Sequence, residues 1–132
     1  MQTGYTVPSI DQWLKEATAD PASENIGMFL THIGIVRRTS KSEVHFAGTT
    51  APVTGMILSY DQEKVNSVIH TAYQMPGICY IKVWVNEGTL KVGDDIMRIL
   101  IGGDIRPHVV DALQFIITEM KSHCICEKEL FS

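Results

Sequence analysis

Apolar residues fall into short runs rich in β-branched side chains along most of the chain, and polar residues separate the runs. A strand of a globular protein typically reads as such a run of about four to eight residues bounded by turn residues. The pattern predicts strands within residues 26–38, 55–60, 78–85, 96–102 and 124–131, with a short extended piece near residue 90.

Two segments repeat apolar residues every three or four positions, which is the spacing of one face of an α-helix. One follows Asp61, which can cap a helix, and its apolar face comprises Val65, Val68, Ile69, Ala72 and Tyr73. The other begins at Asp104, or at the Gly102-Gly103 pair before it, and runs to about Lys121. Pro107 falls in its first turns, where a missing amide hydrogen costs least. Its buried face is predicted to comprise Val109, Val110, Leu113, Ile116, Ile117 and Met120.

A shorter helix is predicted near the N-terminus. Ser9, followed three residues later by Gln12, forms a capping box ahead of a helix-favouring segment. This helix should stop near Pro21, where polar residues also break the pattern. Residues 39–53 are polar and predict a surface loop, in which residues 44–46 could add a short strand.

The predicted order of elements is α-β-β-α-β-β-α-β over 132 residues. Because this alternation is too irregular for a doubly wound parallel sheet, it favours an α+β fold with a mostly antiparallel sheet and packed helices. The length fits a single domain, residues 1–132, that can bury a real core. A hydrophobic content of 45% with 20% charged residues is that of an ordinary globular protein.

Charge, hydrophobicity and cysteine content argue against a nucleic-acid-binding, a membrane-spanning and a secreted protein. A formal net charge of −4 argues against a sequence-independent nucleic-acid binder, which normally shows a basic excess. No apolar run approaches the ~20 residues of a membrane span, and no secretory leader is recognised at the N-terminus. Three cysteines without a framework spacing then indicate reduced thiols in a cytoplasmic protein.

The run His123-Cys124-Ile125-Cys126 offers soft metal ligands near the C-terminus. A structural zinc site usually needs four ligands with paired spacings, and this run has no second cluster. In a strand, Cys124 and Cys126 would point to the same face, as two buried apolar residues would. We therefore expect core cysteines and neither a metal nor another cofactor, with a metal or redox element as the alternative.

Two lysines flank this run. Lys121 lies at the predicted C-terminal end of the long helix, where a positive charge suits the helix dipole, and Lys128 lies in the following strand. Taken separately, each is an ordinary solvated side chain. If the intervening turn brings them together, their repulsion favours a neutral amine that can act as nucleophile or base.

Arginines mark two further positions. Arg37 and Arg38 end the first predicted strand, and Arg106 lies in the first turn of the last helix. Around Arg106, the segment IGGDIRPH combines free backbone N–H groups with a guanidinium, which can hold a phosphate or carboxylate. An ordinary turn and helix cap accounts for the same residues, and Asp104 and Asp111 oppose anion binding.

Read together, these segments resemble the large, catalytic subunit of molybdopterin synthase. The resemblance is carried by FLTHIGIVRR at residues 29–38, EGTLKVGDDIMRILIGG at 87–103 and IRPHVVDALQFIITEMKSHCICEKE at 105–129. The last block is the most specific, because the hairpin, the helix and both lysines occur in the family's order.

The resemblance implies an α/β hammerhead-like fold and a homodimer that binds two small sulfur-carrier subunits, giving a heterotetramer. Each ubiquitin-like carrier delivers sulfur as a thiocarboxylate on its C-terminal Gly-Gly. This sulfur transfer converts cyclic pyranopterin monophosphate, the pterin phosphate substrate, to molybdopterin in molybdenum cofactor biosynthesis. Lys121 and Lys128 match the family's catalytic lysines, while Arg37 and Arg106 match substrate-binding arginines, with Arg106 acting across the dimer.

Departures from the family pattern leave a second hypothesis open. Ile105 stands where the family has a histidine, and Val85-Asn86 stands where it has a His-Arg pair. The sequence also ends at Ser132, before the longer tail of the family. The alternative is a diverged, non-catalytic homologue that binds a carrier protein or a pterin, or that only dimerises.

Overall fold

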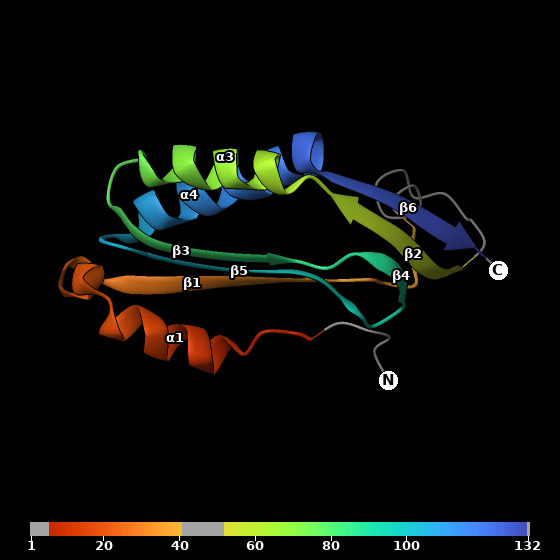
Figure 1. Cartoon of the computed structure of the whole chain (residues 1–132), viewed down its shortest axis with the longest axis horizontal. Coiled ribbons are helices and arrows are strands. Elements are labelled where there is room, and N and C mark those ends of the chain that lie inside the picture. The colour runs from red at the N-terminus through yellow and green to blue at the C-terminus, as the bar shows by residue number, and fades with distance from the viewer. Residues whose placement is uncertain (1–5, 41–51, 132) are drawn as a thin grey trace.

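The computed structural model describes residues 6–40 and 52–131, and in this part of the chain two three-stranded antiparallel sheets pack with helices (Figure 1). The predicted α+β class is confirmed. Most of the predicted loop at residues 39–53, with its possible strand at 44–46, lies outside the described residues. The elements in chain order are α1 Ile10–Ala19, the 3₁₀ helix η1 Pro21–Asn25, β1 Met28–Ile35, β2 Val53–Tyr60, α3 Gln62–Tyr73, β3 Ile78–Val85, β4 Gly88–Lys91, β5 Asp95–Gly103, α4 Arg106–Glu119, the π-helical turn η2 Met120–Cys124 and β6 Ile125–Phe131.

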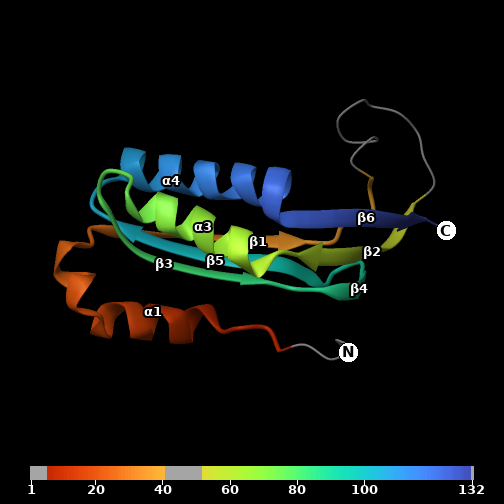
Figure 2. The same ribbon diagram turned by 45° about the horizontal axis from the view of Figure 1, so that its top comes forward.

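The strands form sheets of order β1-β5-β3 and β4-β2-β6, and every pairing is antiparallel. The first sheet carries α1 on one face and α3 with α4 on the other (Figure 2). The second sheet lies beyond the C-terminal end of α4, so the chain passes from that helix into β6 alongside β2. Among the described residues, none of the helices has the length and apolar character needed to cross a membrane.

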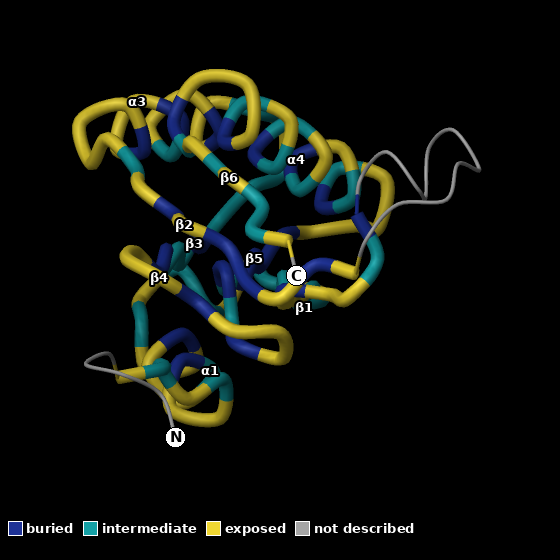
Figure 3. The backbone as a smooth tube through the Cα atoms, turned by 90° about the vertical axis from the view of Figure 1, so that its right-hand side faces the viewer, coloured by how far each residue is buried: buried dark blue, intermediate teal, exposed yellow. Residues whose placement is uncertain are grey.

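The central strand β5 is buried on both faces. Ile99, Leu100 and Ile101 are each 0% exposed. Ile99 and Ile101 belong to the main core with α3 and α4, whereas Leu100 packs with Trp13 and Ala17 of α1. Figure 3 shows buried backbone segments in the middle of the molecule, between α1 on one side and α3 with α4 on the other. A near-continuous apolar run is the expected sequence for a strand covered on both faces.

Local hydrogen bonds set where the helices begin. The Ser9 hydroxyl accepts a hydrogen bond from the Gln12 backbone N–H at 3.2 Å, which confirms the predicted N-cap. The Asp61 carboxylate accepts from two backbone N–H groups in the same way at the start of α3. The last helix begins at Arg106, later than predicted, because Ile105 is still in an extended conformation.

The apolar faces predicted for the two longer helices largely coincide with the buried ones. The buried residues are Val65, Val68, Ala72, Val109, Ala112, Ile116 and Met120. Tyr73 is an exception, since it is 40% exposed and its hydroxyl accepts a hydrogen bond from the Ile81 backbone N–H at 2.9 Å. Its polar tip therefore ties α3 to β3 at the edge of the core.

The two-sided burial of β5 yields a stability prediction. Ile99→Ala is expected to lower the free energy of unfolding by about 2–5 kcal/mol, because it removes fully buried methyl groups and leaves a cavity. Ile57, which is 42% exposed on β2, provides the matched control, and Ile57→Ala should cost less than about 1 kcal/mol. Urea unfolding with an unchanged m-value measures both losses. Equal losses in the two variants would contradict the assigned core.

Candidate functional site

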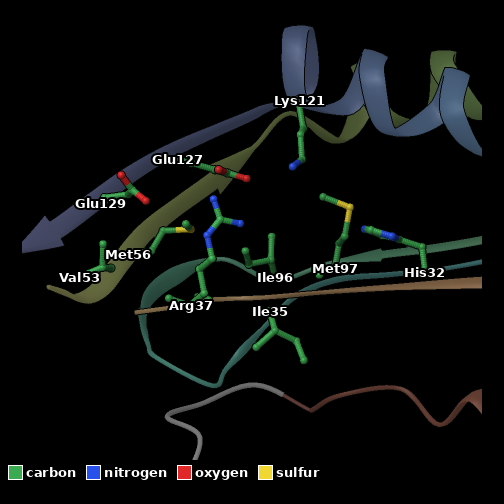
Figure 4. Close-up of a pocket in the computed structure, with 12 residues that line it drawn as sticks. His32, Ile35, Arg37, Val53, Met56, Ile96, Met97, Lys121, Glu127 and Glu129 are labelled. Atoms are coloured by element: carbon green, nitrogen blue, oxygen red, sulfur yellow. The ribbon is translucent and has the colours of Figure 1, made fainter. Parts of the chain in front are cut away.

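A cleft of about 390 Å³ opens where the end of β1 and the end of α4 meet the inner face of β6. Its walls contain apolar residues of β2 and β5 together with charged and polar groups from β1, the turn after α4, and β6 (Figure 4). The polar side chains on its wall are His32, Arg37, Lys121, Glu127 and Glu129. We call it the Lys121 cleft.

Lys121 reaches this cleft because α4 does not continue regularly to its predicted end. The regular helix stops at Glu119, and residues Met120–Cys124 form a π-helical turn, a feature that often occurs at functional sites. Met120 is 0% exposed and anchors the start of the turn in the core. The side chain of Lys121, which follows it, points into the cleft (Figure 4).

Arg37 is held at the opposite wall by the backbone that precedes it. The buried Val36 accepts a hydrogen bond from the Gly93 N–H at 2.8 Å and donates one to the Asp94 carbonyl at 3.0 Å. These bonds tie the end of β1 to the turn between β4 and β5. The Arg37 Nε donates to the Thr39 carbonyl at 3.0 Å, and its guanidinium points into the cleft. Arg37 and Lys121 therefore converge on one cavity.

His32 is a cleft residue that sequence reasoning did not single out. It lies on β1 directly opposite Ile99, and its imidazole lies beside Met97 on the cleft wall (Figure 4). Burial lowers the pKa of His32, and the nearby positive charge of Lys121 lowers it further. The imidazole is therefore neutral at pH 7. The sequence did offer one indication of this role, because His32 lies two residues after the apolar Leu30 and therefore on the same, core-facing side of β1.

Lys128 faces away from the Lys121 cleft. In the antiparallel pairing of β6 with β2, Lys128 lies opposite the exposed Ile57, whereas Glu127 and Glu129 lie opposite the buried Leu58 and Met56. Directly paired residues share a face of the sheet. The inner face therefore carries the two glutamates, and the structure does not bring Lys128 together with Lys121.

Arg106 is also distant from the cleft of its own chain. It is the first residue of α4, and fifteen residues of roughly helical rise place it about 20 Å from Lys121. Next to it, the His108 imidazole and the Asp104 carboxylate lie 2.7 Å apart, and this hydrogen bond lowers the pKa of Asp104. The carboxylate also accepts from the Ile105 N–H at 2.6 Å. An acidic group thus already occupies part of the predicted anion cradle.

The prediction of two core cysteines is wrong for Cys126. Cys124 is 4% exposed at the end of the π-helical turn, before the strand begins, whereas Cys126 is exposed on β6. The two thiols do not share one strand face because Cys124 is not part of the strand. Within the described part of the chain, no group of three or more His, Cys, Asp or Glu residues is placed to hold a metal ion.

Comparison with solved structures identifies the class of fold. The chain is similar to the molybdopterin synthase of Staphylococcus aureus, with a TM-score of 0.73 and 16% identity over 95% of this chain and 86% of that one. It is also similar to a chain in a complex of subunits 1 and 2 of the molybdopterin-converting factor of Helicobacter pylori. The TM-score is 0.65 and the sequence identity 18%, over 92% of this chain and 75% of that one. For the MoaE protein of Burkholderia ambifaria, the TM-score is 0.68 and the sequence identity 16%, over 94% of this chain and 80% of that one.

The family follows from the sequence itself. The model of the MoaE protein family matches residues 6–123, so the chain belongs to the MoaE family. This confirms the predicted resemblance to the large subunit of molybdopterin synthase and places the chain in molybdenum cofactor biosynthesis. No curated protein is significantly similar in sequence.

The corrected cysteine positions predict different thiol reactivities. Burial raises the pKa of the Cys124 thiol, so little thiolate forms at pH 7.5, whereas Cys126 is exposed to solvent. A charged thiol reagent should modify Cys126 at least about tenfold faster than Cys124. Cys126→Ser should remove the faster reaction followed by peptide mass spectrometry, and Cys124→Ser should leave it. Equal rates at the two thiols would contradict the assigned burial.

Proposed function

We propose that this protein is the catalytic large subunit of a molybdopterin synthase, and that the Lys121 cleft is its active site. The proposed reaction transfers sulfur from a thiocarboxylated small subunit to cyclic pyranopterin monophosphate. The observation that carries the proposal is the convergence of Lys121 and Arg37 on one cleft in a chain of the MoaE family. The Helicobacter pylori complex of subunits 1 and 2 supports a small-subunit partner.

The chemistry of these two side chains suits that reaction. Arg37 presents a guanidinium, which binds phosphate or carboxylate oxygens through paired hydrogen bonds. Lys121 can attract the thiocarboxylate, and its ammonium can donate a proton to the phosphate ester oxygen that the attacking sulfur displaces from carbon when the cyclic phosphate opens. Within residues 6–40 and 52–131, Lys121 makes no ion pair or hydrogen bond that would compete with a ligand.

Lys128 remains a proposed second catalytic residue, although it lies on the outer face of β6. From that face it can serve a ligand only if the small subunit or a second copy of the chain covers the outer side of β6. We therefore assign Lys121 the direct role in the Lys121 cleft and expect Lys128 to contribute less to the rate.

A non-catalytic homologue is the second candidate function. Ile105, which is 52% exposed, provides no polar group where the family has a histidine. Glu127 and Glu129 add negative charge to a cleft proposed to bind anions. Such a protein would bind the carrier or the pterin in the same cleft without turnover.

Reconstitution with a thiocarboxylated carrier and cyclic pyranopterin monophosphate tests the proposal. The wild-type chain should form the dithiolene product, and Lys121→Ala should lower the rate by roughly 10²–10⁴-fold through loss of the proton donor. Lys128→Ala should lower it less. Unfolding by urea provides the control, since loss of an exposed helix-end charge should cost under about 1 kcal/mol. If the wild-type chain binds the carrier but forms no product, the result would favour a non-catalytic homologue over the proposed enzyme.

The proposed role of Arg106 across a homodimer has its own test. If the cleft of one subunit uses the partner copy's arginine, a mixed dimer of Lys121→Ala and Arg106→Ala chains contains one intact site. Because random exchange yields mixed dimers in half of the population, activity should recover to about a quarter of wild type. Each variant alone should be inactive or nearly so. Full activity of Arg106→Ala alone would place Arg106 outside the active site, and no recovery in verified mixed dimers would contradict its action across the dimer.

A further inference from the structure

The imidazole of His32 is open to the Lys121 cleft because of the residue that follows it on the same face of β1. Leu30, the preceding residue on that face, packs against the core, but Gly34 has no side chain. A Cβ atom at Gly34 would lie 3.7 Å from His32 Nε2 and 3.6 Å from Met97 Cγ. The glycine therefore leaves free space beside Nε2, and this space belongs to the cleft.

The hydrogen-bonding capacity of His32 is not used inside the protein. Within residues 6–40 and 52–131, neither imidazole nitrogen makes a hydrogen bond or an ion pair, although the side chain is half-buried. A polar group withdrawn from water without a partner costs free energy, and a ligand in the cleft could supply the partner. This is the arrangement of a binding group rather than of a histidine satisfied within the core.

The charged groups around His32 define what kind of ligand it would meet. The other charged side chains of the cleft are Lys121 after α4, Arg37 after β1, and Glu127 and Glu129 on β6, whereas β5 presents the apolar Ile96 and Met97. Lys121 is close enough for its charge to act on the imidazole. An anionic group attracted to the Lys121 ammonium would therefore lie in the cleft that the His32 imidazole also lines.

We propose that His32 is a further ligand-binding residue of the Lys121 cleft, donating a hydrogen bond to the oxoanion group that Lys121 attracts. The proposal rests on the proposed function only for the identity of that group, a phosphate or a (thio)carboxylate. A neutral imidazole can donate through one ring nitrogen without adding a second full charge beside the lysine. It supplies a polar contact on the β1 wall, in a chain that has Ile105 where the family has a histidine.

The proposal predicts how anion binding changes with pH. Because burial and the charge of Lys121 lower the pKa of His32, the imidazole gains its proton only at a lower pH than a free histidine side chain does. Protonation adds a positive charge to the cleft, so anion affinity should rise as the pH falls through that pKa. Sulfate is the suitable probe, since it remains a dianion throughout the range from pH 5 to pH 8.

The test measures sulfate binding to the unliganded, full-length chain by NMR, with His32→Gln used to assign the His32 ring signals. In the wild type, sulfate should shift the His32 signals and bind more tightly below the pKa of His32, read from the same NMR titration, than at pH 7.5. His32→Gln should weaken binding below that pKa by about tenfold and flatten the pH dependence. His70→Gln, at an exposed position on α3, is the matched control and should behave as wild type.

The variant Lys121→Met tests whether Lys121 and His32 bind the same sulfate ion or act at two independent sites. It should raise the pKa of His32, because the neighbouring positive charge is lost, and should also weaken sulfate binding. Unchanged sulfate affinity and pH dependence in His32→Gln would overturn the proposal. This readout needs no turnover, so it still decides the role of His32 if the wild-type chain proves inactive in reconstitution. If the wild type is active, His32→Gln should raise the KM for the pterin more than it lowers kcat.

Discussion

Burial of β5 on both faces is the constraint on which the rest of the structure depends. Ile99 and Ile101 require α3 and α4 on one side of the first sheet, and Leu100 requires α1 on the other. With its buried face fixed in this way, α4 is held along the sheet and ends above the region where β1 terminates. Core packing therefore brings Lys121 into the cleft that His32 and Arg37 also line.

The second determinant of the site is the register of β6 against β2. Side chains alternate between the faces of a strand, so a shift of one residue would exchange Lys128 for the two glutamates in the cleft. The π-helical turn sets this register. Its ends are anchored by the buried Met120 and Cys124, and the Cys124 carbonyl accepts a hydrogen bond from the Asp61 N–H at 2.9 Å. The start of β6 is thus fixed beside the end of β2.

Local patterns allowed most of the fold to be predicted, because its helices and strands depend on periodicity and capping. The Ser9 cap, the buried faces of α3 and α4, and the antiparallel class were read from neighbouring residues alone. The placement of Lys128 was not predictable in this way. It depends on the π-helical turn, and the hydrogen-bond pattern that widens the end of a helix leaves no distinct signature in residue spacing. Cys126 was misplaced for the same reason.

The residues of the site likewise divide into those that the sequence predicted and those that only the structure revealed. Arg37 and Lys121 were found through the family pattern, and the structure adds that they share a cavity. His32, Glu127 and Glu129 were missed, because each becomes a cleft residue only through pairing between strands distant in sequence. Long-range pairing of this kind is the information that a single sequence expresses least directly.

The distribution of charge within the Lys121 cleft bears on which ligand fills it. Lys121 and His32 lie at the α4 end, Glu127 and Glu129 lie along β6, and Arg37 lies between them (Figure 4). Lys121 and Arg37 favour an anionic group at their end of the cleft, whereas the carboxylates along β6 disfavour a second one beside them. An extended chain terminus carries one anionic group, its carboxyl group, and is followed by neutral backbone. The distribution of charge in the cleft is therefore compatible with the carboxyl-terminal tail of the proposed small subunit, with its single carboxyl group at the Lys121 end.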